Sequence, residues 1–543
     1  MRLARLASIA MLTAAACAGP RVPPPLPASK LLDAPPVPEA LPAADPTLLA
    51  VARARDPLEL LRKLGLDPDT LGLMLPGFKP AELHPGALTG FVWAPPAERA
   101  FPVVLGLLPT ASDSSVAQAL QSRFDGLQLR PLGGDTLAAM EPAALDKGLQ
   151  APDSLRSMAQ APLQDDVQLH VAMKAVMARY RPTLDRFLAV MKAAAAARGP
   201  DDTSASMKAM LEGLEALDSL TLGARVLPDA FLGSVVTRAK EQPAPVAEMP
   251  LSQDLVRYLP PGSLRMLANG RFLRRSYDWI GNMNSGAFGD PKFSAAFRDN
   301  LDEWVKNPKL QAAVSFSLSK EKLFRIVQVV SAPGNADALL ETMIKGSSLL
   351  GDPAMQAGLS QRGLSCKNDL RRGARQVEGW PVDHLEVDCK LSASAAAPHT
   401  PPAVAKMLAR LYPMVIEAAR VGDFLVVEVN GGGGADLDRM VRELLSGKPS
   451  GQPLAAAATF PERSFLLGDL DLAMLSAGVD GLMAEAGTKT RLPPLDPALP
   501  KVTTTAFEAG GVTQYRVLVP KAVVGAISAA SAALKAGAAK DSE

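Results

Sequence analysis

The sequence predicts an α+β fold of repeated strand–helix–hairpin–helix units, with largely antiparallel sheets covered by helices. Three observations lead to this prediction. Short β-rich runs come in pairs across Gly or Pro turns, stretches with helical periodicity follow them, and this order recurs along the chain. The chain has 543 residues, 48% hydrophobic and 21% charged, which is long enough and apolar enough for two to four domains.

The clearest unit lies at the C-terminal end. Residues 464–470 form an apolar strand, and residues 472–486 have the periodicity of a helix. The β-rich runs 502–508 and 512–519 flank Gly510-Gly511, and glycine favours the positive φ of a hairpin turn. A final helix is predicted after Pro520, with one apolar face made of Val523, Ile527, Ala530 and Leu534.

Three earlier units follow the same order less regularly. The third is predicted to comprise a strand at 264–268, helical stretches from Phe272 and Ala295, a hairpin of 314–318 with 323–330, and a helix at 336–344. The second comprises a strand at 167–171, a helix broken by Pro182, and a hairpin of 220–226 with 231–236. The first comprises a strand from Leu48, a helix at 57–64, a hairpin of 88–93 with 101–108, and a helix at 115–124.

Two further strand-to-helix pieces, at 134–140 and 422–429, each contain Gly-Asp at the start. Their positions after the first and third units predict a two-fold internal duplication into domains 47–248 and 249–537. The linker is expected at Glu241–Pro250, because it contains three prolines, and residues 538–543 are expected to be a disordered tail. This layout resembles that of some large, uncharacterised exported bacterial proteins.

The first 16 residues are predicted to be a secretory signal peptide. Arg2 and Arg5 form a positive segment, and an apolar stretch of 11 residues, 6–16, follows them. This stretch is too short to span a bilayer, which needs about 20 residues.

The segment Leu12-Thr13-Ala14-Ala15-Ala16-Cys17 resembles the lipobox of bacterial lipoproteins. The resemblance implies cleavage before Cys17 and attachment of lipid to Cys17. This sequence departs from the family at Ala14, where the family prefers a larger aliphatic residue. Ala14-Ala15-Ala16 also fits an ordinary A-x-A cleavage site, so an unlipidated periplasmic or secreted product is the alternative. Ala18 is not an inner-membrane retention Asp, so by family analogy an outer-membrane destination is expected.

Residues 17–46 are predicted to be the anchor cysteine followed by an extended tether. Ten prolines lie between residues 18 and 46, and proline can neither continue a helix nor pair within a sheet. At about 3.1 Å per residue, such a tether reaches roughly 90 Å at most.

Cys366 and Cys389 are predicted to form a disulfide. They are an even pair in an exported chain, and there is no C-x-x-C motif to favour a redox or metal role. Strand alternation places Leu385, Val387 and Cys389 on one face, so two strands with inward cysteines can meet.

The charge distribution argues against several partners. The 57 basic and 56 acidic residues give a net charge of +1, which disfavours a nucleic-acid surface or a polybasic membrane patch. The basic-aromatic segment Arg271–Tyr277 is interpreted as a charged helix face.

The glycine-rich segment Asn430–Asp436 follows a predicted strand and precedes a helix, where a phosphate loop would lie. It lacks the G-x-G-x-x-G fingerprint because position 436 is Asp, so it is interpreted as a turn, with no nucleotide or other cofactor expected.

No catalytic motif was found. The four histidines are His84, His170, His384 and His399, and neither H-E-x-x-H nor G-x-S-x-G occurs. His384, Glu386 and Asp388 share one strand face and form a weak metal candidate, but a solvated face is the preferred interpretation.

The sequence therefore predicts an exported, lipid-anchored envelope protein with a non-catalytic binding or structural role. Its expected contacts are the membrane, through lipid on Cys17, and an envelope protein partner. The alternatives are a carrier of an apolar ligand such as a lipid, and a hydrolase without a recognisable motif.

Overall fold

The computed structural model describes residues 47–67, 77, 79–94, 102–161, 163, 165–196, 211–240, 250–272, 307–319, 321–348, 356, 360, 364–391, 410–431, 433–460, 464–485, 491–509 and 512–540. Cys17, the tether, most of the linker at 241–250 and the helices predicted from Phe272 and Ala295 lie largely or wholly outside these residues.

The described strands belong to a single sheet of 18 strands. Those before residue 250 are β1 (Leu48–Ala54), β2 (Leu88–Trp93), β3 (Val103–Leu108), β4 (Gln128–Leu132), β5 (Asp135–Ala139), β6 (Val167–Val171), β7 (Leu217–Val226) and β8 (Ala230–Ala239). Those after residue 250 are β9 (Leu264–Asn269), β10 (Gln311–Ser319), β11 (Leu323–Ser331), β12 (Leu364–Val377), β13 (Trp380–Leu391), β14 (Met414–Val421), β15 (Phe424–Val429), β16 (Ser464–Leu470), β17 (Val502–Ala509) and β18 (Val512–Pro520).

The strand pairings define one linear order across the sheet. The first part runs β4-β5-β3-β2-β1-β6-β7-β8. The second part continues β18-β17-β16-β9-β10-β11-β15-β14-β13-β12. All these pairings are antiparallel, so the predicted mixture of helices with a largely antiparallel sheet is confirmed, as one continuous sheet.

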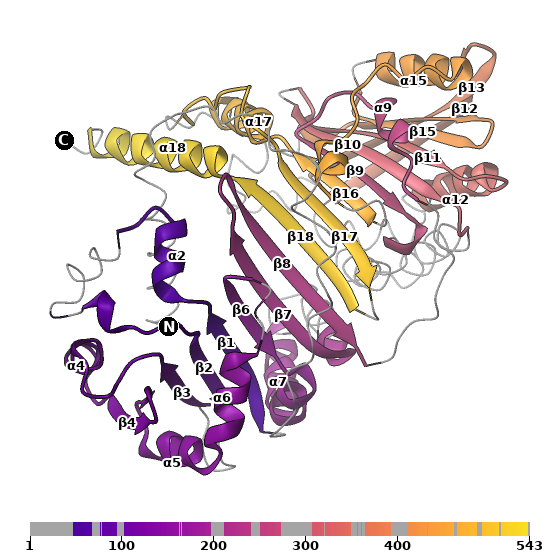
Figure 1. The fold of residues 1–543 in the computed structure, drawn as a ribbon. Coiled ribbons are helices and arrows are strands. Elements are labelled where there is room, and N and C mark those ends of the chain that lie inside the picture. The colour runs from indigo at the N-terminus through magenta and orange to yellow at the C-terminus, as the bar shows by residue number, and fades with distance from the viewer. Residues whose placement is uncertain are drawn as a thin grey trace.

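The two parts of the chain join where β8 lies beside β18. Figure 1 shows these two strands side by side, with the N-terminal strands beyond one and the C-terminal strands beyond the other. Their ladder runs from Val512 opposite Arg238 to Pro520 opposite Ala230 without a register shift. One sheet therefore connects the N-terminal and the C-terminal parts of the described chain.

Helices pack on both faces of this sheet. The described helices are α2 (Pro57–Lys63), the 3-10 turn η2 (Pro80–Glu82), α4 (Ser115–Arg123), α5 (Pro142–Gln150), α6 (Pro152–Gln160), α7 (Met173–Ala196), α9 (Gln253–Arg257), α12 (Ala336–Ser348), α15 (Ala435–Ser446), α16 (Ala455–Thr459), α17 (Leu472–Glu485) and α18 (Lys521–Lys540).

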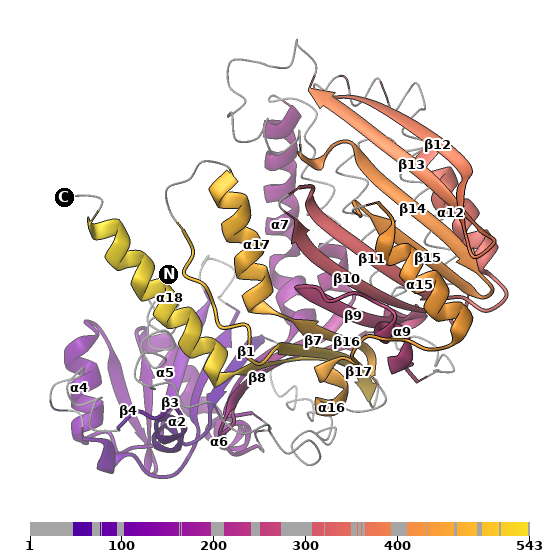
Figure 2. The ribbon, with the colours of Figure 1, turned by 90° about the horizontal axis from the view of Figure 1, so that it is seen from above.

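The alternation of strand residues distinguishes two faces in the second part of the sheet. On what we call the α15 face, α9, α15 and α16 cover a core that contains Leu267, Ala313 and Val329. On the opposite α12 face, α12 packs against Ala312 and Val330. In the first part, α5 and α6 cover a separate core around Phe91, Leu105 and Leu137. Figure 2 shows α7 and α17 projecting from one side of the central strands and α16 lying on the other.

A row of polar side chains crosses the centre of the sheet on the α15 face. Gln168, Gly223, Ser234 and Arg516 lie opposite one another on β6, β7, β8 and β18. Gly223 leaves room for the buried carboxylate of Asp165, with which an added Cβ would collide. Asp165 accepts a 2.9 Å hydrogen bond from Ser234, so a carboxylate and a guanidinium lie within one buried row.

Two helices differ from the sequence prediction. α7 continues through Pro182 instead of breaking there, since Pro removes one helical hydrogen bond while the rest of a 24-residue helix is retained. The expected apolar face of α18 is buried only at Val523, while Ile527 is 48% exposed. α18 also continues three residues into the expected tail. Within the described residues, no helix has both the length and the apolar character required to span a membrane.

The predicted disulfide is confirmed. Cys366 on β12 and Cys389 on β13 lie directly opposite each other and are bonded. Both are buried in a small cluster with Leu385 and Val387. β12 pairs only with β13 among the described strands, so the disulfide ties an edge strand to the sheet.

Replacing both Cys366 and Cys389 with Ala is expected to lower the free energy of unfolding by about 2–4 kcal/mol, because the unfolded chain loses a covalent loop. Urea unfolding with and without reductant measures this change, and hydrogen exchange in β12 measures its local part. Equal urea midpoints for the oxidised and reduced protein would contradict the prediction.

Candidate functional site

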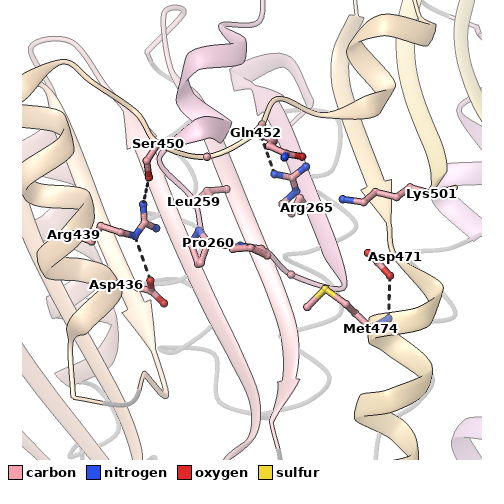
Figure 3. Close-up of a pocket in the computed structure, with 13 residues that line it drawn as sticks. Leu259, Pro260, Arg265, Asp436, Arg439, Ser450, Gln452, Asp471, Met474 and Lys501 are labelled. Carbon is pink, nitrogen blue, oxygen red and sulfur yellow. Dashed lines mark hydrogen bonds and ion pairs between the residues drawn. The ribbon is translucent and has the colours of Figure 1, made fainter. Parts of the chain in front are cut away.

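A cleft of about 430 Å³ lies at one end of the central strands. Its walls are formed where β9 and β17 begin and where β16 ends, together with residues of α15 and α17. Figure 3 shows the side chains that surround it. They are Leu259, Pro260, Pro261, Gly262, Arg265, Asp436, Arg439, Ser450, Gly451, Gln452, Asp471, Met474 and Lys501.

The segment Pro260-Pro261-Gly262 forms one wall and leads into β9. A Cβ at Gly262 would clash with the Ser315 hydroxyl and with the carbonyl oxygen of Phe316 on β10, so only glycine fits there. Ser263 donates a 3.1 Å hydrogen bond to the same Phe316 carbonyl. The Asp471 amide donates to the Ser263 carbonyl at 2.7 Å, so this wall is fixed to both neighbouring strands.

A second wall is the extended segment at residues 449–453. The amide of Gly451 donates to the Arg257 carbonyl at 2.8 Å, and Arg257 Nε donates back to the Gly451 carbonyl at 3.2 Å. An added Cβ at Gly451 would clash with the carbonyl oxygen of Arg257. One backbone and one side-chain hydrogen bond therefore hold this wall to Arg257, which shortly precedes the first wall in the sequence.

Arg265 lies beneath the cleft as a buried cation. Only 5% of the residue is exposed, and its guanidinium donates to the carbonyls of Gln452 at 2.9 Å and Pro453 at 3.2 Å. Its Nη2 also lies 3.5 Å from a carboxylate oxygen of Asp469, the residue opposite it on β16. Asp469 in turn accepts hydrogen bonds from the first two amides of α16, at 2.7 and 2.9 Å.

Arg439 and Asp436 form the side of the cleft that belongs to α15. Arg439 bonds the Tyr258 carbonyl at 3.0 Å and a Glu443 carboxylate oxygen at 2.8 Å. It also lies 3.5 Å from Asp436. Burial acts to raise the pKa of Glu443, but the hydrogen bonds from Ser450 and Arg439 outweigh it and lower that pKa below its ordinary value. Glu443 is therefore held as a carboxylate that neutralises Arg439.

Lys501 differs from the other charged cleft residues. Asp471 accepts the Met474 amide at 3.0 Å and so caps α17, and Asp436 pairs with both Arg325 and Arg439. Among the described residues, no ion pair or side-chain hydrogen bond is found for Lys501. Figure 3 shows its side chain extending into the space between Arg265 and Asp471. The cleft therefore contains one cation whose charge is not neutralised by a close partner.

A second cleft, of about 420 Å³, lies in the first part of the chain. His84 Nε2 is 3.1 Å from Asp135 and 3.2 Å from the Gly134 carbonyl, at the rim of this cleft. Its described lining residues include no Ser, Thr or Cys, so no hydroxyl or thiol nucleophile among them accompanies the His–Asp pair.

The glycine-rich segment at 430–436 does form the predicted turn before α15. Gly433 and Gly434 have φ values of +86° and +77°, which favour glycine, and Gly434 caps the helix. The amide of Leu437 donates to Glu428 Oε2 at 3.1 Å, so the chain's own carboxylate lies where a phosphate would bind. Arg325 pairs with this carboxylate at 2.5 Å.

The weak metal candidate His384, Glu386 and Asp388 lies on β13 as the alternation predicted, opposite the buried Leu385, Val387 and Cys389. His384 lies 3.5 Å from Glu417 on β14, which Arg375 binds at 2.8 Å, and Asp388 pairs with Lys390 at 3.2 Å. Within the described part of the chain, no group of three or more His, Cys, Asp or Glu residues is placed to hold a metal ion.

The other candidate residues from the sequence do not line the cleft. His170 is half-buried and its Nδ1 lies 2.9 Å from the Thr221 hydroxyl; burial, followed by the positive charge of Arg53, lowers the pKa of His170. Arg271 pairs with Glu508, and the rest of the Arg271–Tyr277 segment lies mostly outside the described residues. Cys17 and His399 also lie outside them.

Comparison with known proteins leaves the cleft without a precedent. The chain matches no protein-family model, no curated protein and no solved structure at a significant level.

Sequence reasoning missed the cleft, although two signals point to it. Pro260-Pro261-Gly262 directly precedes a strand, and Arg265 and Asp469 are charged residues within otherwise apolar or small strand segments. A charged residue in such a position predicts an oppositely charged buried partner, and Arg265 and Asp469 are each other's partners.

Asp469→Asn is expected to destabilise the protein by about 3–5 kcal/mol, because Arg265 then remains buried without its carboxylate and α16 loses a charged cap. Urea unfolding gives the value. Asp496→Asn is the matched control, since Asp496 is an exposed acid that accepts only the local Ala498 amide at 2.8 Å. A cost below about 1 kcal/mol for Asp469→Asn would mean that the pair contributes little.

Proposed function

We propose that the chain is an exported, lipid-anchored binding protein of the bacterial cell envelope, and that the cleft around Lys501 binds an anionic group such as a phosphate or a carboxylate. The role is binding and not catalysis. The observation that carries the proposal is Lys501, a cation without a partner among the described residues, in a cleft of about 430 Å³ that Arg265 and Arg439 also line.

The charges of the other cleft residues favour an anion over a cation. Asp436 and Asp471, which line the cleft, are engaged by arginines and a helix amide, and Glu443, which binds the lining residue Arg439, also accepts a serine hydroxyl, so these acidic charges are largely satisfied. An ammonium point charge with three free donors is a common ligand for phosphate. A bound anion would supply the partner that Lys501 lacks.

The export and anchoring parts of the proposal rest on the signal-peptide pattern and the lipobox resemblance at Cys17. The Cys366–Cys389 disulfide supports them, since disulfides persist in oxidising compartments such as the periplasm and are rare in the cytosol. We place the anchor in the outer membrane, with a soluble periplasmic or secreted product as the alternative.

We also propose that 47–248 and 249–537 are duplicated halves. Counted outward from the β8–β18 junction, the first half has the order β8-β7-β6-β1-β2-β3-β5-β4. The second has β18-β17-β16-β9-β10-β11-β15-β14. Strand by strand these orders correspond, and the hairpin β12–β13 is an addition to the second half. This agreement supports a duplication, because many orders of eight strands are possible.

The anchor is tested by the intact mass of the protein recovered from membranes, compared with a Cys17→Ser variant. A mass that fits cleavage before Cys17 plus acyl chains is expected, together with release of the variant from the membrane, because a single-residue change removes the attachment site. A soluble, unacylated wild-type product would contradict lipid anchoring.

The anion site is tested with inorganic phosphate and the Lys501→Met variant. Wild-type protein is expected to bind phosphate measurably in isothermal titration calorimetry, and the variant about tenfold more weakly, because a charge-assisted hydrogen bond is lost. Lys174→Met is the matched control, since Lys174 is exposed on α7 and does not line the cleft. Equal affinities for wild type and Lys501→Met would place the anion elsewhere.

A further inference from the structure

The second cleft, of about 420 Å³, lies at the strand ends of the first part of the sheet. β1 and β3 end on this side, and β2 and β5 begin there. Arg55 directly follows β1, and Asp135 is the first residue of β5, so these two lining residues stand at the same end of the sheet with β2 and β3 between them. The second cleft shares no lining residue with the cleft around Lys501, so it is a separate candidate site.

The second cleft contains opposite charges that do not pair with each other. Arg55 donates a hydrogen bond to the Leu163 carbonyl, and among the described residues no carboxylate partner is found for it. Asp135 lies 3.1 Å from His84 Nε2, and within the described part of the chain no Lys or Arg is paired with it. Asp56 also lines the cleft, but it accepts two amides at the start of α2, at 3.0 and 3.2 Å. A guanidinium and a carboxylate are therefore left for a ligand to bridge.

The walls of the second cleft are largely apolar and are fixed by hydrogen bonds. Leu107 and Pro109 line it from β3 and the residues that follow this strand. The His84 amide donates to the Pro109 carbonyl at 2.9 Å, which fixes one wall to the end of β3. The buried guanidinium of Arg53 donates to two carbonyls near the end of α6, at 3.0 and 2.8 Å, and so fixes the wall formed by residues 159–163. Little rearrangement is therefore needed before a ligand enters.

We propose that the second cleft binds a short peptide of two or three residues with free termini. The C-terminal carboxylate of the peptide pairs with Arg55, because a guanidinium can bind a carboxylate through two parallel hydrogen bonds. The N-terminal ammonium pairs with Asp135. Gln160 lines the cleft, and no hydrogen bond of its side chain is found among the described residues, so its amide is placed to bond a peptide group. This site is additional to the anion site at Lys501 and does not depend on it.

The separation of the two charges favours a peptide over a single amino acid. β1 and β5 are three strand spacings apart, which at about 4.8 Å per spacing places the backbones of Arg55 and Asp135 about 14 Å apart. Both side chains shorten this distance. An amino acid carries its ammonium and carboxylate on one carbon and is too short to reach both, whereas a peptide extends by about 3.3–3.6 Å per residue. The volume of the cleft also lies in the range of about 300–1,000 Å³ that is typical of small-molecule sites.

The inference is tested by isothermal titration calorimetry on the full mature chain with four probes. They are trialanine, its N-acetyl form without the ammonium, its C-terminal amide without the carboxylate, and free alanine. Trialanine is expected to bind at least about tenfold more tightly than each of the others, because only trialanine forms both charge-assisted contacts. This comparison uses the wild-type protein alone, so it does not depend on the folding of any variant.

Two variants assign each terminus of the peptide to a side chain. Arg55→Met is expected to bind trialanine and its amide equally, because the group that recognises the carboxylate is gone. Asp135→Asn is expected to bind trialanine and its N-acetyl form equally. Arg123→Met and Asp146→Asn are the matched controls, since both residues are exposed, on α4 and α5, and do not line the cleft. Lys501→Met is expected to bind trialanine as the wild type does.

The outcomes separate this site from the anion site. No binding of trialanine, or equal wild-type affinities for trialanine and its two blocked forms, would overturn the peptide inference and leave the anion site at Lys501 standing. A preference for the free carboxylate alone, removed by Arg55→Met, would make the second cleft a carboxylate site and the assignment of a peptide wrong. Preferences that persist in both Arg55→Met and Asp135→Asn would place the peptide elsewhere on the protein.

Discussion

The pairing of β8 with β18 is the constraint on which the rest of the molecule depends. Each of these strands comes from a different part of the chain, and nine residue pairs join them without a bulge. This ladder converts two groups of strands into one sheet, so the helices α7 and α17 project from a common surface (Figure 2). If β8 and β18 separated, each would become a long edge strand whose unpaired backbone groups could pair with another chain, which favours aggregation. Among the described strands, the two edges of the sheet are therefore β4 and β12.

The centre of the sheet contains buried charged side chains, Asp165 and Arg516. Arg516 on β18 is 3% exposed, and burial lowers its pKa to about 10, while the carboxylate of Asp165 acts in the opposite direction. Burial also raises the pKa of Asp165, which the Ser234 hydroxyl and Arg225 oppose. Phe507, with its ring 4.9 Å from the Arg516 guanidinium, contributes a cation–π contact. Such groups add little stability compared with an apolar core, but they penalise any register that leaves them unpaired. The β8–β18 ladder is thus fixed by polar complementarity as well as by backbone hydrogen bonds.

Local sequence patterns predict local elements here and fail where contacts are long-range. The alternation around Leu385 and Cys389 was sufficient to predict the disulfide, because period-two patterning fixes which face each cysteine occupies. Pro182 was misinterpreted as a break, since a helix of 24 residues tolerates one lost hydrogen bond when its first turns pack against the sheet. Arg265 and the carbonyls of residues 452 and 453 that it binds are nearly 190 residues apart in the sequence, and no periodic pattern indicates that they are in contact. The cleft, unlike the strands that support it, was therefore beyond sequence patterns.

The position of the cleft follows from the same sheet geometry. Neighbouring antiparallel strands run in opposite directions. The start of β9, the end of β16 and the start of β17 therefore lie together at one end of the sheet, and the segments that adjoin these strands meet there. Two segments at this end approach a neighbour closely: Gly262 approaches β10 and Gly451 approaches Arg257, and at either position an added Cβ would clash. Polar groups are common at this end of the sheet, because backbone groups beyond the strand ends lack partners in the sheet and need other hydrogen bonds. What distinguishes this end of the sheet is that, among the described residues, no partner is found for Lys501, whereas each neighbouring charge has one.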